Sequence, residues 1–245
     1  MLFRSSQYFT DSKFLSEVKT RVGKQSWDRL LDTDVSGITS LDVSFKGITS
    51  INGIEYFTNL QFLSCDNNKI ASIDVSKLTN LKILHCNANQ LTSLKLGSLL
   101  SLHSLYCDSN QLTYLDVGGL TGLKTLTFGR NQVAWVDLSK LTLLQRLDCD
   151  SNKLLVLDVT GLDNLSSIDC SDNYLTSIKG LRSGYKGYLL YNPQKAIKAV
   201  IDIGSVPSSA VPYNPLTLTG VVSPTDATYN NPQYIRWSID RKSVV

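Results

Sequence analysis

Carboxylates recur at a fixed interval along the later part of this chain. Asp148 and Asp169 are 21 residues apart, and Asp150 lies two residues beyond the first of them. Because other residue types repeat at the same interval, we expect the two aspartates on successive coils of one structure, roughly 5 Å apart. Like charges at that distance repel unless a cation, a basic partner or a nearby arginine relieves them.

This acidic pair is compatible with three kinds of chemistry. Neutralisation by Arg130 and Arg146, or simple solvation, requires nothing further. Calcium binding requires six or more oxygen ligands, and no loop supplies them in an ordered spacing. A retaining glycosidase uses two carboxylates at this separation, but an open strip offers no cleft that excludes water. We favour the first interpretation, leave calcium open and predict no catalytic residue.

Apolar and aromatic side chains occupy the equivalent outward positions of the earlier segments. Scattered surface hydrophobes are normal, but such residues on neighbouring coils of one face are typical of protein recognition, where a few anchors supply much of the affinity. Acidic residues beside them would set orientation and association rate. The predicted partner-binding residues are Phe62, Ile83, His85, Tyr106, Arg146, Asp148 and Asp169.

Histidine and cysteine do not form a recognisable metal site. His85 and Cys86 are adjacent in an expected strand, so their side chains point to opposite faces, and His103 has no partner at ligand spacing. No glycine-rich phosphate loop occurs, and no spacing of Ser, His and Asp indicates a nucleophile elbow or a triad. The sequence predicts no metal and no cofactor.

A sequence repeat predicts the strands and turns on which these residues lie. Six segments follow the pattern LxxLxCxxNxLxxLDVSxLTx at a spacing of 21 residues. A unit of this length cannot bury its own apolar face, so copies stack and their apolar columns merge into one core. Period-two alternation places Leu63 and Cys65 inward and their neighbours outward. The columns are Cys65, Cys86, Cys107, Cys149 and Cys170, with Phe128 standing in once, and Asn68, Asn89, Asn110, Asn131, Asn152 and Asn173.

The asparagine and aspartate columns have different predicted roles. A buried amide is costly unless its donors and acceptors are paired, so an unbroken Asn column predicts a ladder of bonds to the backbone within each turn and toward the next coil. An Asp column (Asp74, Asp116, Asp137 and Asp158) is interrupted by Lys95. Because it tolerates a charge reversal, we interpret it as turn-capping and solvent-facing.

The five cysteines occupy one inward position, and stacked coils bring thiols near each other. Regular stacking already satisfies them as small core hydrophobes, so we favour buried free thiols over disulfides.

The repeat resembles the leucine-rich repeat family, and its Cys-containing 21-residue form is similar to that of bacterial surface leucine-rich repeat proteins. The resemblance covers Ile38 to Arg182, and a degenerate first repeat at Leu41 to Ile51 is one residue longer than the others. It implies an α/β-type solenoid, a right-handed coil with a parallel β-sheet on a concave, ligand-binding face.

Both ends of the chain differ from the repeats. Residues 10–22 are expected to form a helix, capped by Thr10 or Asp11 and ended by Gly23, which covers the first coil with Trp27, Leu30 and Leu31 behind it. After Arg182 the 21-residue interval disappears, and all six prolines lie in the last 53 residues. The run from Pro215 to Ile239, with Trp237, looks like the start of a bacterial immunoglobulin-like domain of all-β structure.

Four regions follow from these boundaries. We predict an N-terminal region at 1–36 with capping helix 10–22, leucine-rich repeats at 37–182, an end cap and linker at 183–195, and a partial immunoglobulin-like domain at 196–245.

Composition argues against two classes of partner, nucleic acids and the membrane interior. The formal net charge is +3, and no segment carries the dense basic stripe that nucleic acid binding requires. No stretch approaches the ~18 apolar residues of a membrane span, so we expect no membrane insertion within this chain and assign any anchoring to regions outside it.

We therefore predict a non-enzymatic protein-binding or adhesion module. The resemblance implies that it is extracellular or displayed on a bacterial cell surface and that its protein partner binds the concave face. One alternative is a non-catalytic arm of a larger surface enzyme, such as a carbohydrate-active enzyme or a protease. Another is a structural spacer without a partner.

Overall fold

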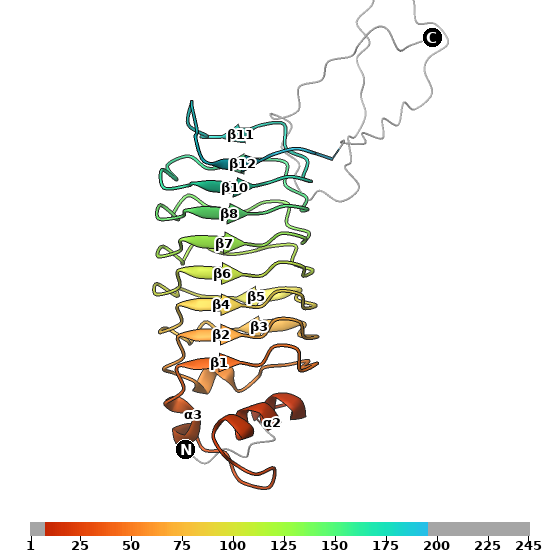
Figure 1. Ribbon diagram of the computed structural model, residues 1–245, viewed down its shortest axis with the longest axis vertical. Coiled ribbons are helices and arrows are strands. Elements are labelled where there is room, and N and C mark those ends of the chain that lie inside the picture. The colour runs from red at the N-terminus through yellow and green to blue at the C-terminus, as the bar shows by residue number, and fades with distance from the viewer. Residues whose placement is uncertain (1–7, 196–245) are drawn as a thin grey trace, which may run out of the picture. The chain divides into compact units, whose positions relative to one another are not determined.

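A computed structural model describes residues 8–195 (Figure 1). They form a stack of coils, and one strand from each coil contributes to a parallel eight-stranded sheet along one side of the stack. The eight strands lie in the order β1-β2-β4-β6-β7-β8-β10-β12. Their bounds are β1 Ser40–Asp42, β2 Phe62–Ser64, β4 Ile83–His85, β6 Ser104–Tyr106, β7 Thr125–Thr127, β8 Arg146–Asp148, β10 Ser167–Asp169 and β12 Tyr188–Leu190. The predicted parallel-strand solenoid is confirmed.

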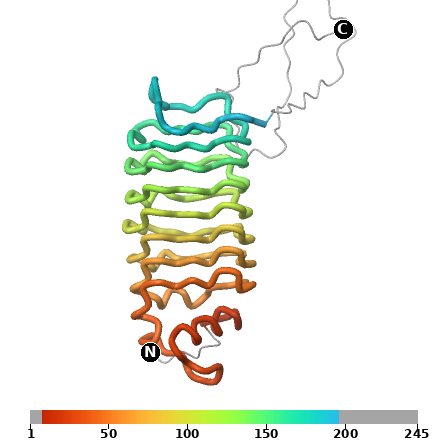
Figure 2. The backbone as a smooth tube through the Cα atoms, viewed as in Figure 1, coloured from red at the N-terminus to blue at the C-terminus, as the bar shows by residue number. Residues whose placement is uncertain are grey.

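The register of the sheet follows the repeat interval. Leu63 lies opposite Leu84 of the next coil, and Leu41 of the first coil lies opposite Leu63. The chain between Leu41 and Leu63 is one residue longer than the chain between Leu63 and Leu84, as the sequence indicates for the first repeat. Figure 2 shows the result, in which each coil stacks directly on the one before it in chain order.

One continuous apolar column fills the coils. The central residue of each sheet strand from β1 to β10 is buried, and the cysteine column lies behind it as five buried free thiols. Burial raises the pKa of these thiols, that of Cys170 to about 12, so they stay protonated and are not nucleophiles at neutral pH. Phe128, also fully buried, occupies the position of this column between Cys107 and Cys149.

The asparagine column closes each turn with the same four bonds. Asn131 accepts from the Leu112 amide at 2.9 Å, and its Nδ2 donates to the Cys107 carbonyl of the preceding coil at 3.0 Å. It also donates to the Phe128 and Gly129 carbonyls of its own turn. The bonds between coils thus run toward the preceding coil, whereas the predicted direction was toward the next one. The residue before each asparagine, such as Arg130 with φ 54°, is left-handed, which turns the chain off the strand.

Short strands on the return side of the coils form a second layer. β3 (Ser72–Asp74) pairs with β5 (Ser93–Lys95), and β9 (Leu157–Asp158) pairs with β11 (Ile178–Lys179). The two coils between these pairs have no strand at the equivalent positions, residues 114–116 and 135–137. The aspartates of this layer cap turns as the sequence indicates; Asp74, for example, accepts from the Ser76 amide at 3.0 Å.

The N-terminal helix covers the first coil. α2 (Ser12–Arg21) begins at Asp11, whose Oδ1 accepts from the Lys13 and Phe14 amides at 2.9 Å, and Phe14 is fully buried. The second oxygen of Asp11 accepts from the amide and hydroxyl of Thr49 at 2.7 Å, which ties the cap to the first coil. The expected capping helix is confirmed. It is followed by α3 (Asp32–Ser36) and a 3-10 turn, η1 (Ile54–Tyr56).

Trp27 does not help to cover the first coil, contrary to the expectation from the sequence. Its side chain is 78% exposed, whereas Leu30 behind the same helix is fully buried. Trp27 lies in the turn between α2 and α3, so it contributes little to covering the coil.

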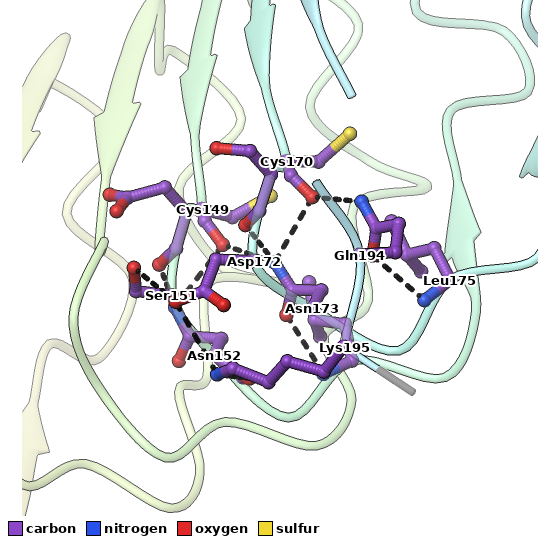
Figure 3. Close-up of polar contacts among 12 residues, drawn as sticks. Cys149, Ser151, Asn152, Cys170, Asp172, Asn173, Leu175, Gln194 and Lys195 are labelled. Atoms are coloured by element: carbon purple, nitrogen blue, oxygen red, sulfur yellow. Dashed lines mark hydrogen bonds and ion pairs between the residues drawn. The ribbon is translucent and has the colours of Figure 1, made fainter. Parts of the chain in front are cut away.

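The last described residues continue the stack. β12 pairs with β10 at an offset of 21 residues, and Gln194, 21 residues after Asn173, takes the next place in the amide ladder. Gln194 accepts from the Leu175 amide at 3.0 Å and donates to the Cys170 carbonyl at 2.9 Å (Figure 3). Residues 183–195, expected as an end cap and linker, thus add a further coil. The predicted immunoglobulin-like domain lies outside the described residues.

Within residues 8–195, no helix has the length and apolar character needed to cross a membrane.

Candidate functional site

The outward side of the eight-stranded sheet, here called the sheet face, carries all seven predicted partner-binding residues. Each strand has three residues, and in the seven strands of this sheet from β1 to β10 the central residue is buried while the two ends are directed outward. In β12 all three residues are exposed. Phe62, Ile83 and Arg146 occupy the first outward position of their strands. His85, Tyr106, Asp148 and Asp169 occupy the other. None of the seven side chains is fully buried.

Three rings on this face form a continuous row. The ring centroids of Phe62 and His85 are 5.6 Å apart, and those of His85 and Tyr106 are 4.4 Å apart. Such tilted contacts hold each ring by its neighbour and leave one side exposed. The row therefore presents a preordered aromatic strip across three adjacent strands.

A carboxylate borders this strip. The Nδ1 atom of His85 lies 3.6 Å from Oδ2 of Asp66, the outward residue just beyond β2. The aromatic row thus has an anionic rim on one side, and a protonated His85 would be paired with it.

A hydrogen-bonded chain of outward side chains, one after each of the strands β2, β4 and β6, was not predicted from the sequence. Asp66 accepts from the Asn87 amide at 2.5 Å, Asn87 accepts from the Asp108 amide at 2.8 Å, and Asp108 accepts from the Gly129 amide at 2.7 Å. Each of these side chains is therefore tied to the coil that follows it. The sequence feature that could have predicted this chain is the column of Asp66, Asn87 and Asp108, which repeats every 21 residues like the other columns of the repeat.

The carboxylate of Asp108 lies close enough to those of Asp148 and Asp150, two coils further on, to affect their ionisation. Burial raises the pKa of Asp108, and the nearby Asp150 raises it further, while bonds from the Thr127 hydroxyl and the Gly129 amide oppose the shift. A Cβ atom at position 129 would overlap the Asp150 carboxylate, so any larger residue there would force this carboxylate to move.

Asp148 is the most perturbed carboxylate on the sheet face. Burial raises the pKa of Asp148 to about 6, and the charges of Asp169, Asp108 and Asp150 add to the effect. Arg146 lies 3.5 Å from Asp148, but its side chain is 56% exposed and it does not bring the pKa down. Among residues 8–195, Arg130 makes no ion pair with Asp108, Asp148, Asp150 or Asp169. Neutralisation by these two arginines is therefore incomplete.

A hollow of about 370 Å³ lies beside this carboxylate, lined by Arg146, Leu147, Asp148, Ser167, Asp169 and Tyr188. Tyr188 extends the sheet face by one strand and is 61% exposed. The sequence missed it because the repeat is not recognisable beyond Arg182. The hollow presents the carboxylates of Asp148 and Asp169 to any group that enters it.

The raised pKa of Asp148 predicts a pH-dependent cost. The folded protein holds this proton more tightly than the unfolded chain, whose Asp titrates near 3.8. Stability should therefore fall as the pH rises from about 4 to about 6, and the full cost applies above that. Asp148→Asn should raise the free energy of unfolding by about 2 kcal/mol at pH 7.5, a discounted value because the side chain is 22% exposed. Urea unfolding at pH 7.5 and pH 4 measures the change.

Below pH 4 the gain should vanish, because both proteins are then uncharged at this position. The control is Asp163→Asn, whose carboxylate is 74% exposed and should change stability by less than about 0.5 kcal/mol at either pH. An equal gain at pH 4 and 7.5 would show that charge is not the cause.

In the part of the chain that the structure describes, no three His, Cys, Asp or Glu side chains are grouped so as to hold a metal ion.

Comparison with known proteins identifies the repeat. A family model described as leucine-rich repeats (two copies) matches residues 58–99. Internalin J of Listeria monocytogenes is 38% identical over 72 residues, which are 29% of this chain and 8% of that protein. The chain thus spans only a small part of this curated relative.

Solved structures give the same result over a longer stretch. A functional domain of internalin J that includes a cysteine ladder is 31% identical, with a TM-score of 0.50, over 71% of this chain and 48% of that one. Internalin C2 from the same organism is 28% identical, with a TM-score of 0.52, over 78% and 96%. A leucine-rich repeat protein of Leptospira interrogans is 25% identical, with a TM-score of 0.56, over 65% and 45%. The chain carries leucine-rich repeats and has internalin-like relatives.

Proposed function

We propose that this chain is a non-catalytic protein-binding module that acts outside a bacterial cell, secreted or held at its surface through regions beyond this sequence. Its protein partner binds the sheet face, the side expected to be concave. The observation that carries the proposal is the half-buried row of Phe62, His85 and Tyr106, whose rings contact one another on a rigid sheet. Its internalin-like relatives support a role in protein interaction rather than catalysis.

The chemistry of the sheet face suits a protein partner. Aromatic side chains on a rigid element supply contact area at low entropic cost, as binding hot spots require. The acidic end, with Asp148 and Asp169 two and three strands beyond Tyr106, supplies long-range attraction and fixes orientation. An apolar anchor and a basic group on the partner would satisfy the two ends together.

Removing two anchors should weaken binding with little loss of stability. We expect Phe62→Ala combined with Tyr106→Ala to lower partner affinity at least tenfold, because both rings lose their contact area. The free energy of unfolding should fall by less than about 2 kcal/mol, since neither ring is fully buried. The immobilised full chain and the double variant, compared for capture of surface proteins, measure the binding, and urea unfolding measures the stability.

The matched control is Leu100→Ala with Leu143→Ala, two apolar side chains that are 65% and 46% exposed in turns outside the strands. This control should capture the same proteins as the unchanged chain. Equal loss in both double variants would remove the sheet face as the binding surface. A loss of stability well beyond the expected limit would place the two rings in the core.

A further inference from the structure

A second exposed apolar column runs along the return side of the coils. Tyr114, Trp135 and Val156 follow one another at 21 residues and are 60%, 48% and 50% exposed. Each alternates with a buried neighbour such as Leu115, so the outward direction of the column is fixed by the core. Large apolar side chains that stay half exposed on three consecutive coils are typical of an interaction surface.

A column of charged residues lies beside this apolar column. In each of these three coils the charged residue comes two positions after the exposed apolar residue and lies on the same side, as Asp116 does after Tyr114. At one end Lys95 donates from Nζ to Oδ2 of Asp74 at 2.9 Å. At the other end Lys179 donates to Oδ2 of Asp158 at 2.7 Å. In both pairs Oδ1 of the aspartate caps its own turn, so the carboxylate divides its two oxygens between a backbone amide and an ammonium group one coil later.

The two middle members of this column lack the lysine. Asp116 caps the Gly118 amide at 3.1 Å and Asp137 caps the Ser139 amide at 2.9 Å, both through Oδ1 as in the flanking pairs. The residue one coil after Asp116 is Asp137, and the residue one coil after that is Asp158, so neither position supplies a cation. Among residues 8–195, neither Asp116 nor Asp137 makes an ion pair.

Asp137 carries a full negative charge at neutral pH. Bonds from the hydroxyl and amide of Ser139 lower the pKa of Asp137, and nearby Lys140 adds to this while Asp158 opposes it. Asp116 and Asp137 lie on the same two coils as Tyr114 and Trp135, and those coils have no strand in the second layer. Carboxylate oxygens beside exposed aromatic rings are the combination that binds a lysine or arginine side chain, through an ion pair and a cation–π contact.

We propose that the surface formed by Tyr114, Trp135, Val156, Asp116 and Asp137, here called the return-face site, docks an extended segment of a partner protein through a lysine or arginine side chain. The cation takes the place that Lys95 and Lys179 hold in the flanking coils, one coil beyond the aspartate it pairs with. Apolar side chains of the segment cover Trp135 and Val156. This site is independent of the binding proposed for the sheet face.

A neutral carbohydrate is the competing ligand, because sugars also stack on exposed aromatic rings. The charge pattern favours a cation, since the chain itself fills the equivalent place with an ammonium group in the coils on either side. A neutral sugar would leave the carboxylates of Asp116 and Asp137 without a cation. Carbohydrate binding is therefore one outcome of the test below.

The test follows the indole N–H signal of Trp135 in the full chain by NMR, assigned from its loss in Trp135→Phe. The probe is an acetylated and amidated ten-residue peptide that alternates valine with lysine. The comparison ligands are the same peptide with glutamate or serine in place of lysine, and dextran. We expect the lysine peptide to shift the Trp135 signal in a saturable way, at least tenfold more tightly than either other peptide, and dextran to leave it unchanged.

Asp137→Lys provides the sharpest variant, because the introduced lysine should pair with Asp116 as Lys95 pairs with Asp74. The variant should fold normally and bind the lysine peptide at least tenfold more weakly. Asp137→Asn, which keeps the Ser139 cap, should weaken binding threefold or more. Asp148→Asn on the sheet face controls for general attraction and should change the affinity less than twofold.

Three results would overturn the proposal. The first is equal response of the Trp135 signal to the lysine and glutamate peptides, and the second is unchanged affinity in both Asp137 variants. The third is a saturable shift with dextran but not with the lysine peptide, which would assign the site to carbohydrate.

Discussion

Replacing Asn131 by alanine should lower the free energy of unfolding by about 4 kcal/mol, one of the two largest effects we expect from a single substitution in this chain. Asn131 lies in the middle of the amide ladder, with asparagines on three coils before it and two after it. The Leu112 amide loses its bond to Oδ1 and remains buried without a partner, which costs about 1–3 kcal/mol. Three carbonyls lose a donor as well, at about 0.5–1.5 kcal/mol each.

The carbonyls are partly protected by their position in the ladder. The Cys107 carbonyl still accepts from Asn110, and the Phe128 carbonyl still accepts from Asn152. Because each of these two carbonyls is bonded by two asparagines, the loss at either of them is incomplete. This is why the expected value lies below the sum of the largest individual costs.

Urea unfolding followed by circular dichroism measures the change, and Asn80→Ala is the matched control. Asn80 is exposed and makes a single side-chain bond, to the Thr58 carbonyl at 2.9 Å, so its removal should cost less than about 1 kcal/mol. Equal losses for the two variants would mean that the ladder contributes no more than an ordinary surface bond.

The stacking of the coils could be predicted from sequence because each column of residues has one packing role. Leu63 and its equivalents lie at the centre of a strand, and a one-residue slip would turn each of them outward. The constant interval of the repeat therefore fixes the register of the sheet, and the larger offset between the first two strands follows from the longer first repeat.

The final coil escaped prediction because residue types changed while the spacing was kept. Tyr191 stands where a cysteine is expected and Gln194 where an asparagine is expected, each 21 residues after its counterpart. The longer glutamine side chain still reaches both the Leu175 amide and the Cys170 carbonyl. Recognising it required the chemistry of the ladder, an amide group, rather than the identity of one residue.

The residues of the candidate surfaces could be predicted only where the alternation of inward and outward side chains along a strand was sufficient to place them. Phe62 and Tyr106 lie outward because alternation says so. The burial of Asp108 was not predictable in this way, because it depends on Thr127 and Gly129 in the next coil. Trp135 was missed for another reason: nothing in one repeat shows that a neighbouring coil lacks the lysine which pairs the charges beside it elsewhere.

Phe128→Ala should also lower the free energy of unfolding by about 4 kcal/mol, through a cavity rather than through lost hydrogen bonds. The ring is fully buried and fills the position of the inward column between Cys107 and Cys149. Deleting it removes a large apolar area from the core, and coils tied to their neighbours by the amide ladder cannot collapse into the space. Losses for buried Phe→Ala changes are about 3–5 kcal/mol.

Two further variants separate volume from chemistry, again by urea unfolding. Cys107→Ala in the same column removes a single buried sulfur and should cost about 1 kcal/mol. Phe128→Cys completes the column of thiols but still leaves most of the cavity, so it should cost about 3 kcal/mol. If Phe128→Cys proved as stable as the unchanged chain, a regular cysteine column, and not the volume of the ring, would set the packing of this coil.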